Sequence, residues 1–289
     1  MKKYLFILLF LITLIIPGAN TIALSDLDGN LDIKDLANEL NISPTIVGDD
    51  DREEITNENA KDLEKAVVIL GYSYDDEILA MCSGAMVGPN LVLTAAHCLF
   101  EDGKYKKDLE VFAVAADKSD NELSLSAKSI ELYVPNEYIE FDRNKYTDSW
   151  PSKKYDYGVI VLDKPIGLET GWFRLKDRPT PWIQIITMGY SGDKPDNTLW
   201  RSESSTGFWV SQHNTFYCNA DVLSGNSGSP IVMKKRPEEI IGILISKDHE
   251  AGDYAPNGYP NVGLKITQPI IDLVTRYNRR TGPYLTPKK

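Results

Sequence analysis

Beyond residue 60 the hydrophobic positions fall into short apolar runs separated by turn residues, and they show little helical periodicity. Short runs rich in β-branched and aromatic residues, bounded by turn residues, are typical of strands. The runs that predict strands are Val67–Leu70, Met86–Val87, Leu91–Leu93, Val111–Val114, Val159–Leu162, Ile183–Thr187, Phe208–Val210 and Ile240–Ile245. Many short strands with frequent turns indicate an all-β barrel or sandwich fold.

Only the end of the chain has apolar residues at helical spacing. We expect a helix over 267–280, with Thr267 as its N-cap residue. The apolar positions of this helix are Ile270, Ile271, Leu273 and Val274. A break in the strand series near Gly167–Pro181 predicts a linker between two halves of the fold.

The chain begins with a thirteen-residue apolar run, Tyr4–Ile16, which follows Lys2 and Lys3 and precedes Pro17. This pattern predicts a signal peptide over residues 1–23, and the run is shorter than the ~20 residues that a membrane span needs. The alternative is an uncleaved N-terminal anchor. Cleavage would give a secreted, extracellular protein without stable membrane association.

Residues 24–44 form a short acidic stretch that we interpret as a pro-segment, so that residues 45–289 would form the mature domain. Within the stretch, Asp26 to Leu31 resembles a calcium-binding loop. Its first ligand position is Leu24, which has no side-chain oxygen, and the motif has no second copy. A solvated acidic segment is therefore the preferred interpretation.

Composition and charge narrow the function classes. The 289 residues, 42% of them hydrophobic, are enough for one large domain or two modest ones. The formal net charge of −11 disfavours non-specific binding to nucleic acid, which depends on neutralising phosphates. Three cysteines allow at most one internal disulfide, with one thiol left over.

Candidate chemistry rests on a histidine, an aspartate and a serine in that order. His97 follows the strand ending at Leu93, Asp156 precedes the Val159–Leu162 strand, and Ser227 lies between glycines in Gly225–Pro230. Each residue alone has a structural explanation. Together they form a set, because a serine nucleophile needs a base near pH 7 and that base needs an orienting carboxylate. An α/β-hydrolase esterase conflicts with this order and with the scarcity of helices.

These motifs resemble those of the chymotrypsin-like serine proteases, and the chain is similar to the bacterial glutamyl endopeptidase family. The matching stretches are Val47–Arg52, Thr94–Cys98, Tyr155–Tyr157, Gly189–Pro195 and Gly225–Pro230. The resemblance implies two six-stranded antiparallel β-barrels, over about 60–166 and 180–265, with the active site in the cleft between them.

The resemblance also implies a role for each site residue. His97 would act as general base, Asp156 would orient it, and Ser227 would attack the peptide carbonyl. The backbone amides of Gly225 and Ser227 would form the oxyanion hole. Protein or peptide substrates are expected, with no metal or organic cofactor, and the protein is expected to be a monomer. The alternative is a protease-like binding or toxin protein with little turnover.

The cysteines fit the same resemblance. It implies a Cys82–Cys98 disulfide that fixes the histidine loop. Cys218 then remains unpaired, and its strand-like surroundings predict a buried small apolar residue, with a reactive thiol as the alternative.

Activation is expected to differ from that of trypsin-like zymogens. In those enzymes the new N-terminal amine pairs with an aspartate just before the catalytic serine, and here that position is Asn226. An amide side chain cannot form that ion pair. The resemblance still implies removal of the pro-segment near Pro44-Thr45-Ile46, which makes the precursor a zymogen.

The specificity pocket departs from the glutamyl endopeptidase pattern. Leu244 occupies the position of a histidine, and Val222 that of a threonine, both of which contact glutamate in the family. A buried carboxylate without partners is costly, so we expect weak Glu preference unless Lys247 or His249 substitutes. The pocket candidates are Asp221, Val222, Leu244 and Ser246. Asp221 falls where an aspartate selects Arg or Lys in trypsin-like enzymes, but some Glu-cleaving relatives also carry one there.

Overall fold

The structure is a computed structural model, and its described residues are 46–56, 58–74, 77–114, 125–147, 149–177, 181–210, 213–247 and 260–280. The chain divides into two units, Met1–Ser43 and Pro44–Lys289, and all described residues lie in the second. The predicted signal peptide, the pro-segment and His249 lie outside the described residues, as do the side chains of Ser246 and Lys247.

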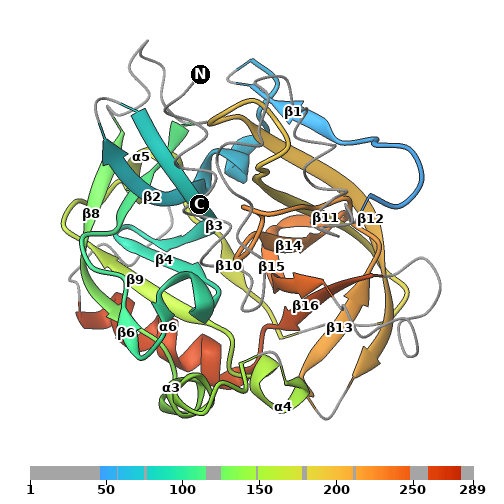
Figure 1. Ribbon diagram of the computed structural model, residues 1–289. Coiled ribbons are helices and arrows are strands. Elements are labelled where there is room, and N and C mark those ends of the chain that lie inside the picture. Colours follow the sequence, from blue (N-terminus) through green and yellow to red (C-terminus); the bar gives the residue numbers. More distant parts are fainter. Residues whose placement is uncertain are drawn as a thin grey trace, which may run out of the picture. The chain divides into compact units, whose positions relative to one another are not determined.

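The first half of the second unit is a closed six-stranded antiparallel barrel (Figure 1). Around the barrel its strands are β2 (Val67–Tyr74), β3 (Glu77–Gly88), β4 (Leu91–Thr94), β9 (Gly158–Leu162), β8 (Ser126–Tyr133) and β7 (Glu110–Phe112). Every residue of β4 and β9 is buried. Continuous burial of this kind explains why these two strands are unbroken apolar runs in the sequence.

The second half is a second ring of six antiparallel strands. Its strands in order are β12 (Leu199–Val210), β11 (Gln184–Tyr190), β14 (Pro230–Met233), β15 (Arg236–Lys247), β16 (Asn261–Lys265) and β13 (Thr215–Cys218), and pairing of β12 with β13 closes the ring. Two strands add to it: β1 (Glu53–Ile55) on β12, and β10 (Arg174–Leu175) parallel to β15. The predicted fold of two six-stranded barrels is confirmed.

The predicted C-terminal helix is also confirmed as α6 (Gln268–Arg280). Thr267 immediately precedes it, and its carbonyl accepts the N–H of Ile271 at 3.1 Å. The helix packs against the first barrel, where the Asn278 side chain donates to the Val87 carbonyl at 3.0 Å. The last described helix thus lies against the first barrel.

The expectation that only the chain end is helical is wrong. Other helices are α3 (Asn136–Arg143), α4 (Trp150–Lys153), α5 (Gly167–Thr170), and the 3-10 helices η2 (Asp62–Ala66) and η3 (Ala96–Cys98), and a small hairpin joins β5 (Phe100–Glu101) to β6 (Lys104–Tyr105). In α3 the only buried residue is Tyr138, so the helix leaves almost no apolar periodicity in the sequence. The connection Gly167–Pro181, predicted as the linker between the two halves, contains α5 and β10.

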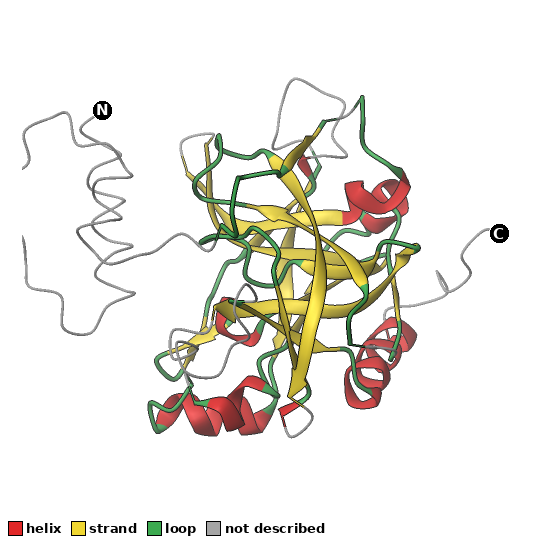
Figure 2. Ribbon diagram, turned by 90° about the vertical axis from the view of Figure 1, so that its right-hand side faces the viewer, coloured by secondary structure: helices red, strands yellow, loops and turns green. Residues whose placement is uncertain are grey.

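In Figure 2 the helices lie at the periphery of the strands. Among the described residues, no helix is both long enough and apolar enough to span a membrane.

Candidate active site

His97 lies in the short helix η3, directly after strand β4. Thr94, the last residue of β4, is fully buried, and its hydroxyl donates to the Ser83 carbonyl at 2.8 Å. The imidazole itself remains about a third exposed (34%). A rigid strand end therefore carries a histidine that solvent and a substrate can reach.

Asp156 reaches His97 because of strand register. β4 and β9 are antiparallel neighbours in which Thr94 pairs with Gly158, so residues just after β4 and just before β9 meet at one end of the barrel. The Nδ1 atom of His97 lies 2.9 Å from Oδ2 and 3.1 Å from Oδ1 of Asp156, and the backbone N–H of His97 donates to Oδ1 at 3.1 Å. Asp156 is buried. A proton on Nδ1 facing this carboxylate leaves Nε2 as the basic nitrogen.

Ser227 comes from the second barrel, in the turn that precedes β14. Its carbonyl accepts the N–H of Ser83 on β3 at 2.9 Å and lies 3.7 Å from the Cys98 sulfur. The Ser83 hydroxyl also donates to the Gly225 carbonyl at 2.9 Å. The serine turn is therefore fixed to the strand and the loop of the first barrel that flank His97.

Two glycines give the serine turn its shape. Gly225 has φ +92° and Gly228 has φ +82°, a conformation that side chains rarely adopt. A Cβ on Gly225 would lie 2.5 Å from the Tyr190 carbonyl oxygen, so no other residue fits. Among the described residues, the N–H groups of Gly225 and Ser227 donate no hydrogen bond. These two donors are the ones for which the family resemblance implies a role in an oxyanion hole.

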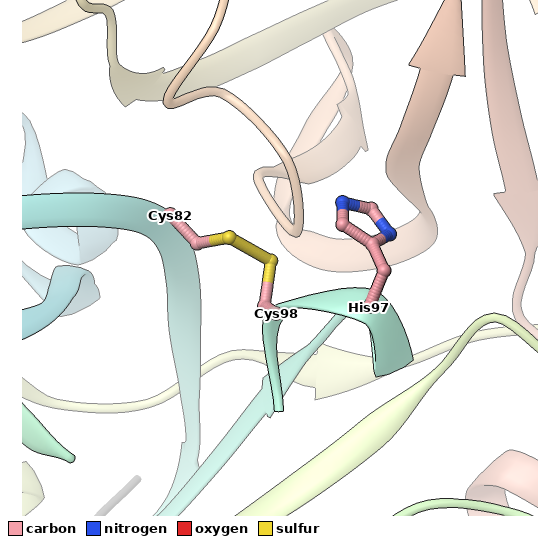
Figure 3. Close-up of side chains that lie close together, drawn as sticks. All are labelled: Cys82, His97 and Cys98. Carbon is pink, nitrogen blue, oxygen red and sulfur yellow. A yellow bond between two sulfur atoms is a disulfide. The ribbon is translucent and has the colours of Figure 1, made fainter. Parts of the chain in front are cut away.

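The predicted disulfide is present. Cys82 and Cys98 form it with a Cα–Cα distance of 6.1 Å, and Figure 3 shows it joining β3 to the helix that carries His97. Potential ligand atoms of Cys82, His97 and Cys98 all lie within 4.8 Å of one another. A sulfur binds metal as a thiolate, so the oxidised pair does not provide a metal site.

Cys218 is unpaired and fully buried in the second barrel. Burial raises the pKa of its thiol to about 12. This agrees with the predicted small apolar residue rather than with a reactive thiol.

The pocket candidates divide into two kinds. Val222 and Leu244 are both buried in one apolar cluster together with Phe216 and Cys218. Asp221 is buried as well, but its Oδ1 accepts the N–H of Val47 at 2.7 Å. Burial raises the pKa of Asp221. The hydrogen bond from the Val47 N–H lowers this pKa but only partly offsets the effect of burial.

A group of charged residues near the serine turn is not among the sequence-based candidates. The Arg52 side chain is buried and pairs with Asp50 and with Asp193. Val47–Arg52 and Gly189–Pro195 are two of the stretches that carry the family resemblance, and the structure joins them. The sequence gives no signal that they touch, because they lie on segments far apart in the chain.

Comparisons with known proteins identify the family and support the fold. The sequence model of the family described as Trypsin matches residues 69–268. Glutamyl endopeptidase of Bacillus licheniformis is 27% identical over 241 residues, which cover 81% of this chain and 69% of that protein. Serine protease 23 of Rattus norvegicus is 27% identical over 216 residues, 64% of this chain and 53% of that protein, so the match spans about half of that relative.

A solved structure supports the fold. The structure of Glu endopeptidase in complex with MPD matches with a TM-score of 0.63 and 24% identity, covering 81% of this chain and 99% of that chain. The family match extends over most of both barrels and includes His97, Asp156 and Ser227. The chain therefore belongs to the trypsin family of chymotrypsin-like serine proteases, which are peptide hydrolases.

Proposed function

We propose that this protein is a secreted serine endopeptidase that cleaves peptide bonds through an acyl-enzyme on Ser227. The observation that carries the proposal is the pairing of His97 with Asp156 through both carboxylate oxygens. The Ser227 turn is bonded to the two segments beside that pair. These contacts support the proposal that His97 acts as the base, Asp156 as its orienting carboxylate and Ser227 as the nucleophile.

In the acylation step the Ser227 oxygen attacks the carbonyl carbon of the substrate, and its proton passes to Nε2 of His97. Asp156 stabilises the imidazolium that forms and holds the ring in the tautomer that accepts the proton. His97 then gives the proton to the leaving amine as the C–N bond breaks. Water hydrolyses the resulting ester by the same route, which restores Ser227.

The oxyanion of the tetrahedral intermediate is assigned to the backbone N–H groups of Gly225 and Ser227. Both donors are free in the described part of the chain. Because they are fixed before the reaction, they stabilise the developing charge without reorganising. Removal of one such donor typically costs ~3–4 kcal/mol of transition-state stabilisation.

Export and maturation complete the proposal. Residues 1–23 act as a signal peptide and 24–44 as a pro-segment, so the mature enzyme comprises residues 45–289. An oxidising compartment outside the cytosol suits the Cys82–Cys98 disulfide. The proposed cleavage site near Pro44 lies just before Val47, whose N–H donates to Asp221.

For specificity we propose an apolar pocket lined by Val222 and Leu244, with weak preference for Glu. Asp221 is engaged by the Val47 N–H and does not act as a selector of Arg or Lys. Profiling on a peptide library should show cleavage after apolar residues. Exclusive cleavage after Glu, or a strong preference for Arg and Lys, would contradict this pocket.

Covalent labelling tests the chemistry. A fluorophosphonate probe should label the secreted mature protein at Ser227, and Ser227→Ala should abolish labelling. Ser229→Ala is the matched control, because this neighbouring serine is fully buried and we expect normal labelling without it. A folded mature protein that does not react would favour a binding or toxin protein that retains the protease fold.

A further inference from the structure

The buried guanidinium of Arg52 binds two aspartates that lie on segments far apart in the chain. Its Nε and Nη2 atoms donate to Asp50 at 2.8 Å, and its Nη1 donates to Asp193 at 3.0 Å and to the Ser191 hydroxyl at 3.1 Å. Lys194 also pairs with Asp50, at 2.7 Å. We call Asp50, Arg52, Ser191, Asp193 and Lys194 the Arg52 cluster. It ties the segment before β1 to the loop that follows β11.

The loop that Arg52 grips is in direct contact with the serine turn. The N–H of Gly192, between Ser191 and Asp193, donates to the Ser224 carbonyl at 2.8 Å. A Cβ on Gly225 would lie 2.5 Å from the Tyr190 carbonyl oxygen and 3.3 Å from the Gly192 nitrogen. The Ser224 carbonyl and the Gly225 N–H belong to the same peptide group, so this loop holds the Gly225 donor in place. A shift of the loop therefore shifts that donor.

The same N-terminal segment holds the other end of the serine turn. The Val47 N–H donates to the Asp221 carboxylate at 2.7 Å, six residues before Ser227. Strand pairing of Glu53 with Arg201 fixes the far end of the segment on β12. Residues 47–55 are thus held at one end by the hydrogen bond to Asp221 and at the other end by strand pairing with β12.

Among the described residues, the serine turn makes no ion pair, so the contacts from the N-terminal segment supply its ionic support. The Asn226 side chain donates to the Leu223 carbonyl at 3.3 Å, which is a bond within the turn. Forked hydrogen bonds between a guanidinium and a carboxylate fix both distance and angle, which a single neutral bond does not. The Arg52 cluster supplies that rigidity from outside the turn.

We propose that Arg52 is a positioning residue for catalysis: through Ser191 and Asp193 it holds the loop that orients the Gly225 N–H in the oxyanion hole. This rests on the proposed endopeptidase function. The hydrogen bonds of the Arg52 side chain go to Asp50, Ser191 and Asp193, and among the described residues none goes to His97, Asp156 or Ser227. The competing explanation is that Arg52 only attaches the N-terminal segment, and this makes a different kinetic prediction.

The test compares Arg52→Met with Arg201→Met. Arg201 is a matched control because it is also buried and pairs with two carboxylates, Glu53 at 2.8 Å and Glu64 at 2.7 Å. Its backbone pairing with Glu53 does not depend on its side chain, and among the described residues that side chain makes no hydrogen bond with the serine turn or with residues 191–194. The melting temperature and the rate of fluorophosphonate labelling are measured for each protein. Their kcat and KM are measured with the peptide amide that library profiling selects as substrate.

For Arg52→Met we expect kcat and the labelling rate to fall ~10–100-fold while KM changes less than about twofold, because only the transition state uses the oxyanion hole. Arg201→Met should lower the melting temperature with kcat within about twofold. Arg52→Lys should recover part of the rate, since it keeps the charge but lacks the fork. Equal kcat in the two Met variants would overturn the proposal. A higher KM and a lower melting temperature of Arg52→Met without a lower kcat would also overturn it.

Two further measurements keep the outcome decisive. If Arg52→Met does not fold, Asp193→Asn replaces it, and an unchanged kcat in that variant would overturn the proposal. Hydrogen exchange of the peptide spanning 221–228 needs no activity: weakening of the cluster should speed its exchange, while Arg201→Met should not. A wild-type protein that no probe labels would refute the proposed endopeptidase, and the exchange data would still decide whether Arg52 holds the turn.

Discussion

His97 is bound twice by Asp156: its Nδ1 lies 2.9 Å from Oδ2, and its backbone N–H donates to Oδ1 at 3.1 Å. The carboxylate therefore fixes both the ring and the main chain of the histidine. This double contact depends on the pairing of Thr94 with Gly158, because a shift of one residue between β4 and β9 would separate the two side chains.

The first prediction concerns Asp156→Asn. An amide can present its N–H group to Nδ1, which favours the tautomer with the proton on Nε2 and removes the base. We expect kcat to fall about 10⁴-fold with the fold intact. Asp163→Asn is the matched control at the other end of β9, where the exposed carboxylate accepts the Lys128 N–H at 2.8 Å. Similar activity of the two variants would remove Asp156 from the mechanism.

The second prediction concerns the disulfide. Cys82 and Cys98 are 16 residues apart, and closing a loop of that size contributes about 3 kcal/mol to the free energy of unfolding. The double variant Cys82→Ala/Cys98→Ala should be destabilised by about this amount in guanidinium unfolding. A reducing agent should destabilise the wild-type protein but not the variant. An effect of reduction on the variant would point to a disulfide between two chains through Cys218, the one cysteine that the variant keeps.

Strands buried along their whole length were predictable from the sequence. Every residue of β4 and β9 is buried, so each strand is an apolar run, and both were predicted within one residue of their ends. By contrast, β8 mixes exposed, half-buried and buried residues, and it was not among the predicted strands. The strands β14 and β16 were missed too: short segments interrupted by glycine or proline carry too little pattern.

The candidate site divides in the same way. His97, Asp156 and Ser227 were predicted because each lies in a recognisable motif and their chemistry requires all three. Arg52 was not predicted as part of the site, because its partner Asp193 is 141 residues away and nothing local marks the pair. Ion pairs between distant segments depend on tertiary structure, which a single sequence does not reveal.

The third prediction concerns acid stability. Hydrogen bonds from Arg52 hold the pKa of Asp50 well below its ordinary value. Burial acts to raise the pKa of Asp193, but Arg52 and Ser191 outweigh it and the pKa is lowered. A carboxyl whose folded-state pKa is lowered stabilises the protein above its unfolded pKa of about 3.9, and this contribution is lost as pH falls.

Unfolding measured between pH 6 and pH 2 checks this prediction. The wild-type protein should lose more stability on acidification than Arg52→Met, because the variant has already lost the charged partner. The other carboxyl groups are common to both proteins and cancel in the difference. Parallel pH curves would show that the Arg52 cluster contributes nothing to acid sensitivity.

The fourth prediction concerns Cys218. Burial raises the pKa of its thiol to about 12, so the nucleophilic thiolate is scarce at pH 8 and solvent does not reach it. Iodoacetamide should leave the native protein unmodified and should alkylate one cysteine per chain after unfolding without reduction. Rapid alkylation of the native protein would show that the second barrel opens at this strand.

The last prediction addresses specificity at Val222 and Leu244. Both side chains are buried in the apolar cluster of the second barrel and offer no hydrogen bond to a carboxylate. Val222→Thr with Leu244→His would supply a hydroxyl and an imidazole at the positions where the resembling family contacts glutamate. A hydrogen bond to a charged group contributes about 1.5–3 kcal/mol, so kcat/KM for cleavage after Glu should rise at least about tenfold relative to cleavage after Leu.

The gain should be larger at pH 6 than at pH 8, because protonated imidazole pairs with the carboxylate. Val222→Thr alone is the control and should give a smaller gain that does not depend on pH; an unchanged ratio in the double variant would place the pocket elsewhere.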